Sequence, residues 1–296
     1  MQWVILKEQE GMLVREYLLE VQHLSRSLLT AIKKNGDILV NGKHVTVRYA
    51  LSYGDQIEIF FPPETHGKAL QPEFDPIQII FEDQDVLVIW KEPGIPTIPS
   101  REHPTGTLAH FVLGYYKTHE IPYTFHVVTR LDKDTSGLVL IAKHRYSHGR
   151  LSELHQKGEV KRRYQAIVEG FVEQDVGTID EPISRHPESI IQRMVSPDGQ
   201  RATTHYKVIK RGEMEGDKMS LLEIELETGR THQIRVHFSF IGHPLLGDDL
   251  YGGRGNWIQR QALHCYSLRF THPFTGETKK FHIPLQEDME QIGERL

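Results

Sequence analysis

The feature that most constrains how this chain folds is a succession of short apolar runs between Pro76 and Pro284, separated by turns rich in glycine. Runs of this length, bounded by turn residues, are typical of β-strands. The strand candidates are residues 79–81, 86–89, 138–141, 164–168 and 221–226, and the helix candidates are 107–117, 145–156 and 232–242. Because strands and helices do not alternate regularly, we predict an α+β domain around a mixed, largely antiparallel sheet.

The first sixty residues predict a smaller unit with its own core. Apolar residues recur at helical spacing from Met12 to Val21, which predicts a first helix. Ser25 can cap a second helix that ends at Gly36. We expect Gly36 to take a positive φ, as glycine often does at a helix C-terminus.

A β-hairpin is predicted next, because Asn41-Gly42 stands between two apolar runs, the second of which is Val45–Val47. We divide the chain into a small α/β-hairpin domain, a polar linker and a larger domain, at residues 1–65, 66–75 and 76–290. The short acidic tail after Leu285 is expected to be solvated.

Composition limits the classes of protein to which this chain can belong. Its 296 residues can bury a sizeable core, and 38% of them are hydrophobic, as in ordinary globular domains. No apolar run approaches the ~20 residues of a membrane helix, so no membrane partner is expected. The single cysteine, Cys265, excludes an intramolecular disulfide framework and suits the reducing cytoplasm. We expect a cytoplasmic monomer.

The distribution of charge favours a nucleic-acid partner, although the net charge is −5. Residues 23–48 and residues 143–169 each carry a net charge of +4. Binding to phosphate groups needs a local basic face rather than a basic protein. The candidate RNA contacts in the first segment are Arg26, Lys33, Lys34, Lys43 and Arg48. Two solvated faces with chance clusters of charge are the alternative.

The segment from Thr129 to Leu140 is the strongest candidate for a site. A strand-like approach ends in a polar turn that contains Asp132, Asp134 and Ser136, and an apolar strand leaves it. Polar side chains held between two rigid elements are well placed to form a site. Aspartate and serine in turns often only satisfy nearby backbone groups, however, so the residues alone leave both interpretations open.

This segment resembles the catalytic signature of the RluA-type RNA pseudouridine synthases, Arg-Leu-Asp-x-x-Thr-Ser-Gly-Leu, which stands here at residues 130–138. Three further stretches resemble the family's motifs in order and spacing: Lys-Glu-Pro-Gly at 91–94, the strand 161–170 with Tyr164, and Thr-Gly-Arg-Thr-His-Gln-Ile-Arg-Val-His at 228–237 with its continuation to 248. The chain departs from the family pattern at Thr129, Trp90 and Glu92. These departures affect the identity of the target more than the class of reaction.

The N-terminal unit resembles a small RNA-binding module, the alpha-L motif, over roughly residues 11–62. That module is shared by a small-subunit ribosomal protein and several RNA-modifying enzymes. Its combination with the four motifs resembles the family members that modify large-subunit ribosomal RNA. The resemblance therefore implies RNA as the partner, with ribosomal RNA favoured and transfer RNA as the alternative substrate.

The resemblance implies an isomerase that turns uridine into pseudouridine in RNA. The reaction breaks the N-glycosidic bond, rotates the uracil and rejoins it through C5, without a cofactor or a metal. It needs an ionised carboxylate, which an ordinary aspartate supplies at neutral pH. By resemblance, Asp132 is that carboxylate, acting either as nucleophile or as base.

The family pattern also implies roles for four other residues. Arg235 is expected to keep Asp132 ionised and oriented. A uridine stacked in an RNA helix cannot reach such a site, so its base must flip out, and Arg130 is expected to fill the vacated space or to steer the phosphate. Tyr164 is expected to pack against the uracil, and Leu263 to line the base pocket.

Other interpretations can be weighed on the residues. The 18 histidines come without a cysteine pair or a His-Glu-x-x-His pattern, so no metal site is expected. Asp132 and Asp134 are a conceivable acid–base pair of a glycosidase, but their separation in a turn is unpredictable. The main rival is a non-catalytic RNA-binding or ribosome-assembly protein, which RNA binding without turnover would support.

Overall fold

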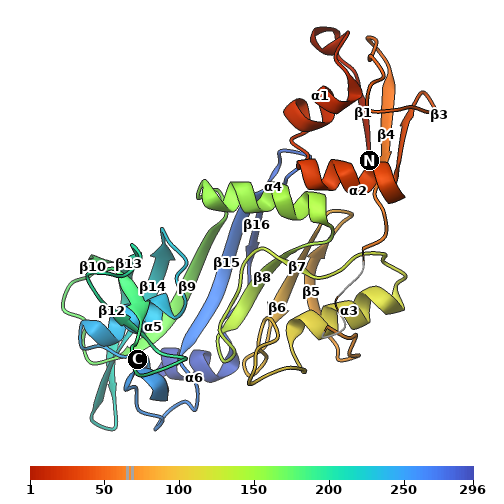
Figure 1. Ribbon diagram of the computed structural model, residues 1–296. Helices are drawn as coiled ribbons and strands as arrows, with labels where there is room; N and C mark the ends of the chain where they lie inside the picture. Colours follow the sequence, from red (N-terminus) through yellow and green to blue (C-terminus); the bar gives the residue numbers. More distant parts are fainter. Residues whose placement is uncertain (65–66, 68–69) are drawn as a thin grey trace.

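The computed structural model describes residues 1–64, 67 and 70–296, and its strands form two main sheets (Figure 1). The strands of the smaller sheet are β1 (Gln2–Val4), β2 (Asp37–Val40), β3 (Lys43–His44) and β4 (Gln56–Phe60), in the order β1-β4-β2-β3. The larger sheet has ten strands. Strands β11 (Ile183–Arg185) and β12 (Arg193–Val195) pair with each other in a separate hairpin.

The ten-stranded sheet is mixed and largely antiparallel, which confirms the predicted fold class. Its main path runs β10 (Val176–Asp180), β13 (Thr203–Met214), β14 (Asp217–Leu226), β9 (Lys161–Glu169), β15 (Leu263–Thr271), β8 (Ser136–Ala142), β6 (Val86–Lys91) and β5 (Gln78–Glu82), while β16 (Thr278–His282) pairs with β15 and β7 (His126–Val127) with β8. Among the described strands, one pair, β15 and β8, is parallel. Its register places His264 beside Ser136, so the start of β15 lies next to the polar turn before β8.

Three helices accompany the sheet at the predicted places: α3 (Leu108–Thr118), α4 (Arg145–Gln156) and α5 (Gln233–Phe240). Strands β6 and β8 are buried on both sides, because elements cover both faces of the sheet at its centre. Their apolar runs are therefore continuous rather than alternating. This buried centre supports the polar turn that enters β8.

The N-terminal unit packs its helices against the small sheet. Its helical elements are η1 (Lys7–Gln9), α1 (Val14–Glu16), the π-helical turn η2 (Tyr17–Val21) and α2 (Arg26–Asn35). The predicted first helix is therefore a short α-helix followed by a π-turn. Ser25 caps α2 as predicted, since its hydroxyl oxygen accepts from the N–H of Leu28 at 3.1 Å.

Two local predictions in this unit are wrong. Gly36 has a φ of −111°, so glycine is not needed there for a positive φ. It is needed for space, because a Cβ at this position would lie 2.3 Å from the carbonyl oxygen of Phe60. The predicted strand Val45–Val47 is also absent: β3 ends at His44, although Asn41-Gly42 forms the expected turn with two positive φ values.

The C-terminal tail is not solvated as predicted but forms helix α6 (Glu287–Arg295). Met289 and Ile292 are 0% and 4% exposed and pack in a cluster with Met219 and Leu221 of the large sheet. The prediction was wrong because the many acidic residues of the tail made its two buried apolar residues, Met289 and Ile292, easy to overlook. The predicted domain boundary at residue 290 falls inside this helix.

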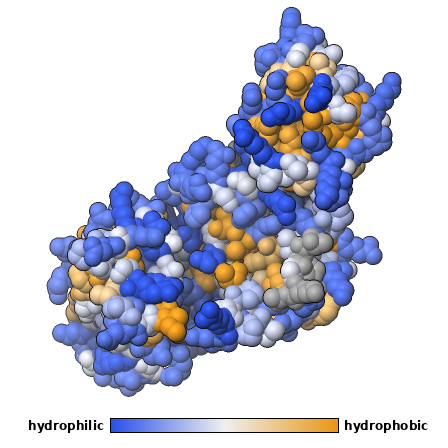
Figure 2. Space-filling model, in the orientation of Figure 1, coloured by the Kyte–Doolittle hydropathy of each residue, from blue (hydrophilic) through white to orange (hydrophobic). Residues whose placement is uncertain are grey.

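The N-terminal unit meets the rest of the chain around Tyr146, at the start of α4 (Figure 1). The Tyr146 hydroxyl donates to the carbonyl oxygen of Gln22 at 2.7 Å, and its ring packs against those of Trp3 and Phe274. Figure 2 shows the unit projecting from the larger part of the molecule. Phe61 joins the same aromatic cluster.

The predicted linker, residues 66–75, falls partly on residues 66, 68 and 69, which lie outside the described part of the chain. Its later residues lie against α3, where the N–H of Glu73 donates to the carbonyl oxygen of His110 at 3.0 Å. In the described part of the chain, no helix has the length and apolar character needed to cross a membrane.

Candidate active site

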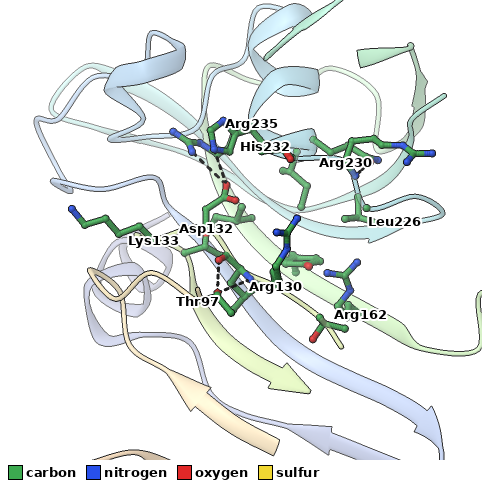
Figure 3. Close-up of a pocket in the computed structure, with 18 of the residues that line it drawn as sticks. Thr97, Arg130, Asp132, Lys133, Arg162, Leu226, Arg230, His232 and Arg235 are labelled. Atoms are coloured by element: carbon green, nitrogen blue, oxygen red, sulfur yellow. Dashed lines mark hydrogen bonds and ion pairs between the residues drawn. The ribbon is translucent and has the colours of Figure 1, made fainter. Parts of the chain in front are cut away.

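Asp132 lies in the loop between β7 and β8, which we call the Asp132 loop (residues 128–135), and faces a cleft (Figure 3). The cleft has a volume of about 740 Å³, within the range of small-molecule sites. Its lining includes the five residues predicted for the site: Arg130, Asp132, Tyr164, Arg235 and Leu263. The side chain of Asp132 is 27% exposed, so its carboxylate is open to the cleft.

Hydroxyl groups fix the backbone of the Asp132 loop. Thr97 Oγ1 donates to the carbonyl oxygen of Leu131 at 2.7 Å and accepts from the Leu131 N–H at 3.2 Å. The hydroxyl oxygen of Thr129 accepts from the N–H of Leu140 at 3.0 Å. Thr129, a departure from the family pattern, thus ties the loop to β8.

A buried lysine holds the middle of the same loop. Lys91 is 1% exposed, and its Nζ donates to the carbonyl oxygens of Lys133 at 2.9 Å and Glu92 at 2.8 Å. Burial lowers the pKa of Lys91 to about 7, against the opposing effect of the carboxylates of Asp134 and Asp132. The loop is therefore held by a lysine whose charge is costly to bury.

Arg260, just before β15, links the end of the loop to helix α6. Its side chain is 9% exposed, and its guanidinium donates to both carboxylate oxygens of Asp288, on α6, at 2.7 Å. Its Nη1 also donates to the carbonyl oxygen of Asp134 at 3.1 Å. At the start of α6, Gln286 donates to the carboxylate of Glu92 at 2.6 Å. The C-terminal helix thus supports both the Asp132 loop and the turn at residues 91–94.

Arg235, on α5, is shared between two carboxylates. Its Nε and Nη2 donate to Asp248 at 2.7 and 2.8 Å, and its Nη1 lies 3.4 Å from Oδ2 of Asp132. Burial would lower the pKa of Arg235, but the hydrogen bonds and charge of Asp248 raise it above its ordinary value. The guanidinium also lies 5.0 Å over the ring of Tyr251. The contacts with Asp248 and Tyr251 therefore fix the position of Arg235 independently of Asp132.

His232 stands beside this pair. Its Nε2 lies 3.9 Å from Oδ2 of Asp132, and its Nδ1 lies 2.9 Å from the hydroxyl of Tyr251. Burial lowers the pKa of His232 against the opposing effect of the Asp132 carboxylate, and the positive charge of Arg235 acts in the same direction as burial. The imidazole is therefore neutral at neutral pH.

An aromatic ring and an aliphatic side chain lie deeper in the cleft. Tyr164 and Leu263 are each 4% exposed, and burial raises the pKa of the Tyr164 hydroxyl. The guanidinium of Arg162 lies 5.9 Å from the centre of the Tyr164 ring. Glycine at residue 229 leaves room for the Arg162 guanidinium, because a Cβ there would lie only 3.1 Å from Nη2 of Arg162. A flat base fits such a surface.

The mouth of the cleft is positively charged. Within residues 1–64, 67 and 70–296, no carboxylate forms an ion pair with Arg130, Lys133, Arg162 or Arg230. Figure 3 shows Lys133 pointing away from the other labelled side chains, whereas Arg130 lies between Asp132 and Arg162. Cations without acidic partners suit a phosphate backbone.

The five predicted RNA contacts of the N-terminal unit do not reach this cleft. All are exposed and, within the described residues, none forms an ion pair; they are Arg26, Lys33, Lys34, Lys43 and Arg48. The first three lie on α2, while Lys43 and Arg48 line a separate hollow with Tyr49.

A grouping of Asp83, Asp85 and His272 has the spacing of metal ligands but not the chemistry. Nδ1 of His272 accepts from the backbone N–H of Thr275 at 3.1 Å, so the neutral ring carries its proton on Nε2. Nε2 is the atom that faces Asp83, at 3.1 Å. A ligating histidine needs the opposite arrangement, with the free nitrogen donating.

Comparison with known proteins decides the family. The family model of the RNA pseudouridylate synthases matches residues 85–240, which contain the Asp132 loop, Tyr164 and Arg235. A Bacillus subtilis protein named as an uncharacterized RNA pseudouridine synthase, YjbO, is 50% identical over 95% of this chain and 98% of its own. This chain belongs to the RNA pseudouridylate synthase family. It is therefore an isomerase that converts uridine to pseudouridine in RNA.

Other relatives agree with this assignment. Ribosomal large subunit pseudouridine synthase D of Haemophilus ducreyi is 38% identical to this synthase over 92% of the chain and 86% of its own. Among solved structures, human RNA pseudouridylate synthase domain containing 1 matches with a TM-score of 0.59 and 23% identity. The match covers 78% of this chain and 96% of that chain, and it shows the same fold.

Several residues of the synthase's site were not identified from the sequence. Three of them stand within or beside the motifs that resemble the family, and this position could have identified them: Asp248, His232 and Arg162. Arg260 and Asp288 stand outside those motifs. Their pairing depends on how α6 folds back onto the sheet, which the acidic tail did not indicate.

The buried Lys91 makes stability depend on pH. Its folded pKa of about 7 lies below the ordinary value of 10.5, so between these pH values the unfolded chain binds more protons. The contribution of Lys91 to the free energy of unfolding should therefore rise with pH in this window, by up to ~1.4 kcal/mol per pH unit. Denaturant unfolding of wild type and Lys91→Met across the window should show a steeper rise in wild type than in the variant. Parallel curves would contradict the assignment.

The brace from α6 should control how fast the synthase turns over. Asp288→Asn leaves Arg260 without its charged partner and loosens the Asp132 loop, so we expect kcat to fall about tenfold, or ~1.4 kcal/mol, with little change in KM. Pseudouridine formation and thermal melting should be measured together. Glu290→Gln, an exposed change on the same helix, is the control. An unchanged kcat in Asp288→Asn would show that the brace is not needed.

Proposed function

We propose that this synthase modifies large-subunit ribosomal RNA and that Asp132 starts the reaction. The substrate proposal is supported by relatives named ribosomal large subunit pseudouridine synthase D, which are 37–38% identical over 87–92% of this chain. The positively charged mouth of the cleft and the exposed cations of the N-terminal unit suit a structured RNA.

The observation that carries the role of Asp132 is the division of Arg235 between two carboxylates. Asp248 occupies Nε and Nη2, and its own side chain is fully buried. Nη1 is left to orient Asp132, whose exposed carboxylate is the one that substrate can reach. The buried aspartate is structural, and the exposed one is free to react.

The proposed chemistry needs only that carboxylate at the sugar. The bond between N1 of uracil and C1′ breaks, the base rotates, and a bond between C5 and C1′ forms. The hydrogen on C5 leaves as a proton, and N1 gains one. Asp132 either attacks C1′ as a nucleophile or removes a proton from C2′ as a base.

The proposed positions of the substrate follow from the rest of the cleft. The flipped uracil lies against Tyr164 and Leu263, which are buried and apolar on the side facing it. Arg130 is exposed at the mouth and has no acidic partner among the described residues, so it is free to occupy the space that the base leaves or to bind a phosphate.

The N-terminal unit is proposed as a second RNA contact. Lys33 and Lys34 lie in the last turn of α2, and Arg26 lies in its first. The proposal also places a single copy of the chain at work in the cytoplasm. The cytoplasm is supported by the one cysteine, Cys265, which is buried and free.

Asp132→Asn should abolish turnover while RNA binding persists, because the amide keeps the shape of the side chain and loses its charge. Transcripts of ribosomal and transfer RNA with tritium on uridine C5 report turnover as released tritium. Asp134→Asn, two positions along the loop, should stay within about tenfold of wild type. Tritium release by Asp132→Asn would sink the catalytic role, and release from transfer RNA alone would sink the substrate proposal.

Charge reversal at Lys33 and Lys34 should weaken RNA binding in a way that depends on salt. Each lost phosphate contact lowers the slope of log K against log salt by roughly 1. Binding should be measured by filter retention over a range of salt concentrations, with Lys207→Glu, an exposed lysine on β13, as the control. Equal slopes for the double variant and wild type would rule out α2 as a contact.

A further inference from the structure

His232 is held in an unusual backbone conformation beside the catalytic carboxylate. Its φ is +59°, in the left-handed region, at the residue before α5. Such a conformation is unfavourable for most side chains and is often found at functional sites. Here it turns the imidazole into the cleft, where the side chain is 12% exposed and Nε2 lies 3.9 Å from Oδ2 of Asp132.

The hydrogen bonds of Tyr251 determine which imidazole nitrogen carries the proton. The Tyr251 hydroxyl oxygen accepts from the backbone N–H of Arg193 at 2.9 Å. Its own hydrogen has one acceptor among the described residues, Nδ1 of His232 at 2.9 Å. Donation to Nδ1 satisfies both groups and places the imidazole proton on Nε2. The N–H that faces the cleft is therefore on Nε2.

This N–H has no acceptor in the described part of the chain. The distance of 3.9 Å to Oδ2 of Asp132 is too long for a hydrogen bond. Burial lowers the pKa of His232 and, with the positive charges of Arg235 and Arg193, outweighs the opposing effect of the Asp132 carboxylate, so the ring stays neutral beside it. A donor that is fixed, neutral and unused in a binding cleft is suited to an oxygen atom of the substrate.

We propose that Nε2 of His232 donates a hydrogen bond to the 2′ oxygen of the target uridine and so selects ribose over deoxyribose. This inference rests on Asp132 as the catalytic residue. By either route, Oδ2 of Asp132 must meet C1′ or its neighbour C2′, and the 2′ oxygen is bonded to C2′. Figure 3 shows His232 and Arg235 on one side of Asp132, with Arg162, which accompanies Tyr164, on the other. The sugar therefore lies toward His232 and the base toward Tyr164.

The test compares two variants of one residue with two forms of one substrate. His232→Asn retains a residue that tolerates the left-handed conformation but is too short to reach the sugar. His232→Gln places an amide N–H near the position of Nε2. The substrates are a synthetic stem-loop around a uridine that wild type isomerises, and the same stem-loop with 2′-deoxyuridine at that position. The quantity compared is the ratio of kcat/KM for the two substrates. Dividing the wild-type ratio by the variant ratio cancels effects of the deoxy sugar that do not involve His232.

Wild type should prefer the ribose substrate by about tenfold or more, the effect of losing one buried hydrogen bond. The preference should fall at least threefold in His232→Asn and return in His232→Gln. His155→Gln, at another histidine that lines the cleft, should keep the wild-type preference whatever its rate. A preference unchanged in His232→Asn, even with a lower rate, would overturn the proposal and leave His232 a structural role.

The experiment separates failure of this inference from failure of the proposed function. The stem-loop is taken from whichever RNA responds, so the inference does not depend on ribosomal RNA being the substrate. Asp132→Asn is assayed on the same stem-loop. Turnover by that variant would contradict the catalytic role on which the inference rests, and would overturn both together. An inactive Asp132→Asn with an unchanged ribose preference in His232→Asn would overturn the role of His232 alone.

Discussion

The site depends on one buried guanidinium that is shared between two carboxylates. Arg235 is held by two short hydrogen bonds to a fully buried aspartate, Asp248, and offers its remaining nitrogen to Asp132. Removing one partner of a buried pair costs about 3–5 kcal/mol, so the position of Arg235 is strongly determined before any substrate arrives. The same residue lies over the ring of Tyr251, which in turn sets the proton of His232. One ion pair thus orders Asp132 and its neighbours.

Within the loop that carries Asp132, one backbone hydrogen bond closes a turn, from the N–H of Thr135 to the carbonyl oxygen of Asp132 at 3.2 Å. Side chains from outside the loop hold it from three further directions: the hydroxyl of Thr97, the ammonium of Lys91 and the guanidinium of Arg260. Each donor reaches a backbone carbonyl rather than a side chain. The loop sequence can therefore vary at exposed positions such as Lys133 while the backbone stays in place.

The sequence predicted the fold class because the strands at the centre of the sheet are apolar throughout, and it predicted α4 to the residue. It did not predict β13, whose exposed polar residues mask the alternation of a strand, or α6, where the buried side chains of Met289 and Ile292 stand among acidic residues. The proximity of Asp132 and Arg235, far apart in the chain, came from resemblance alone. Pairwise contacts such as Arg260 with Asp288 depend on tertiary packing, which local patterns do not contain.

The attachment of the N-terminal unit through Tyr146 has a geometric consequence for substrates. If both the exposed basic helix α2 and the cleft contact RNA as proposed, the chain is a bivalent receptor. Once an RNA is held at one end, the local concentration of its other parts at the second end is fixed by the span between the two. The sequence around a uridine is then only one of the features that select it for modification. The other is the distance, in the folded RNA, between that uridine and a surface that α2 can bind.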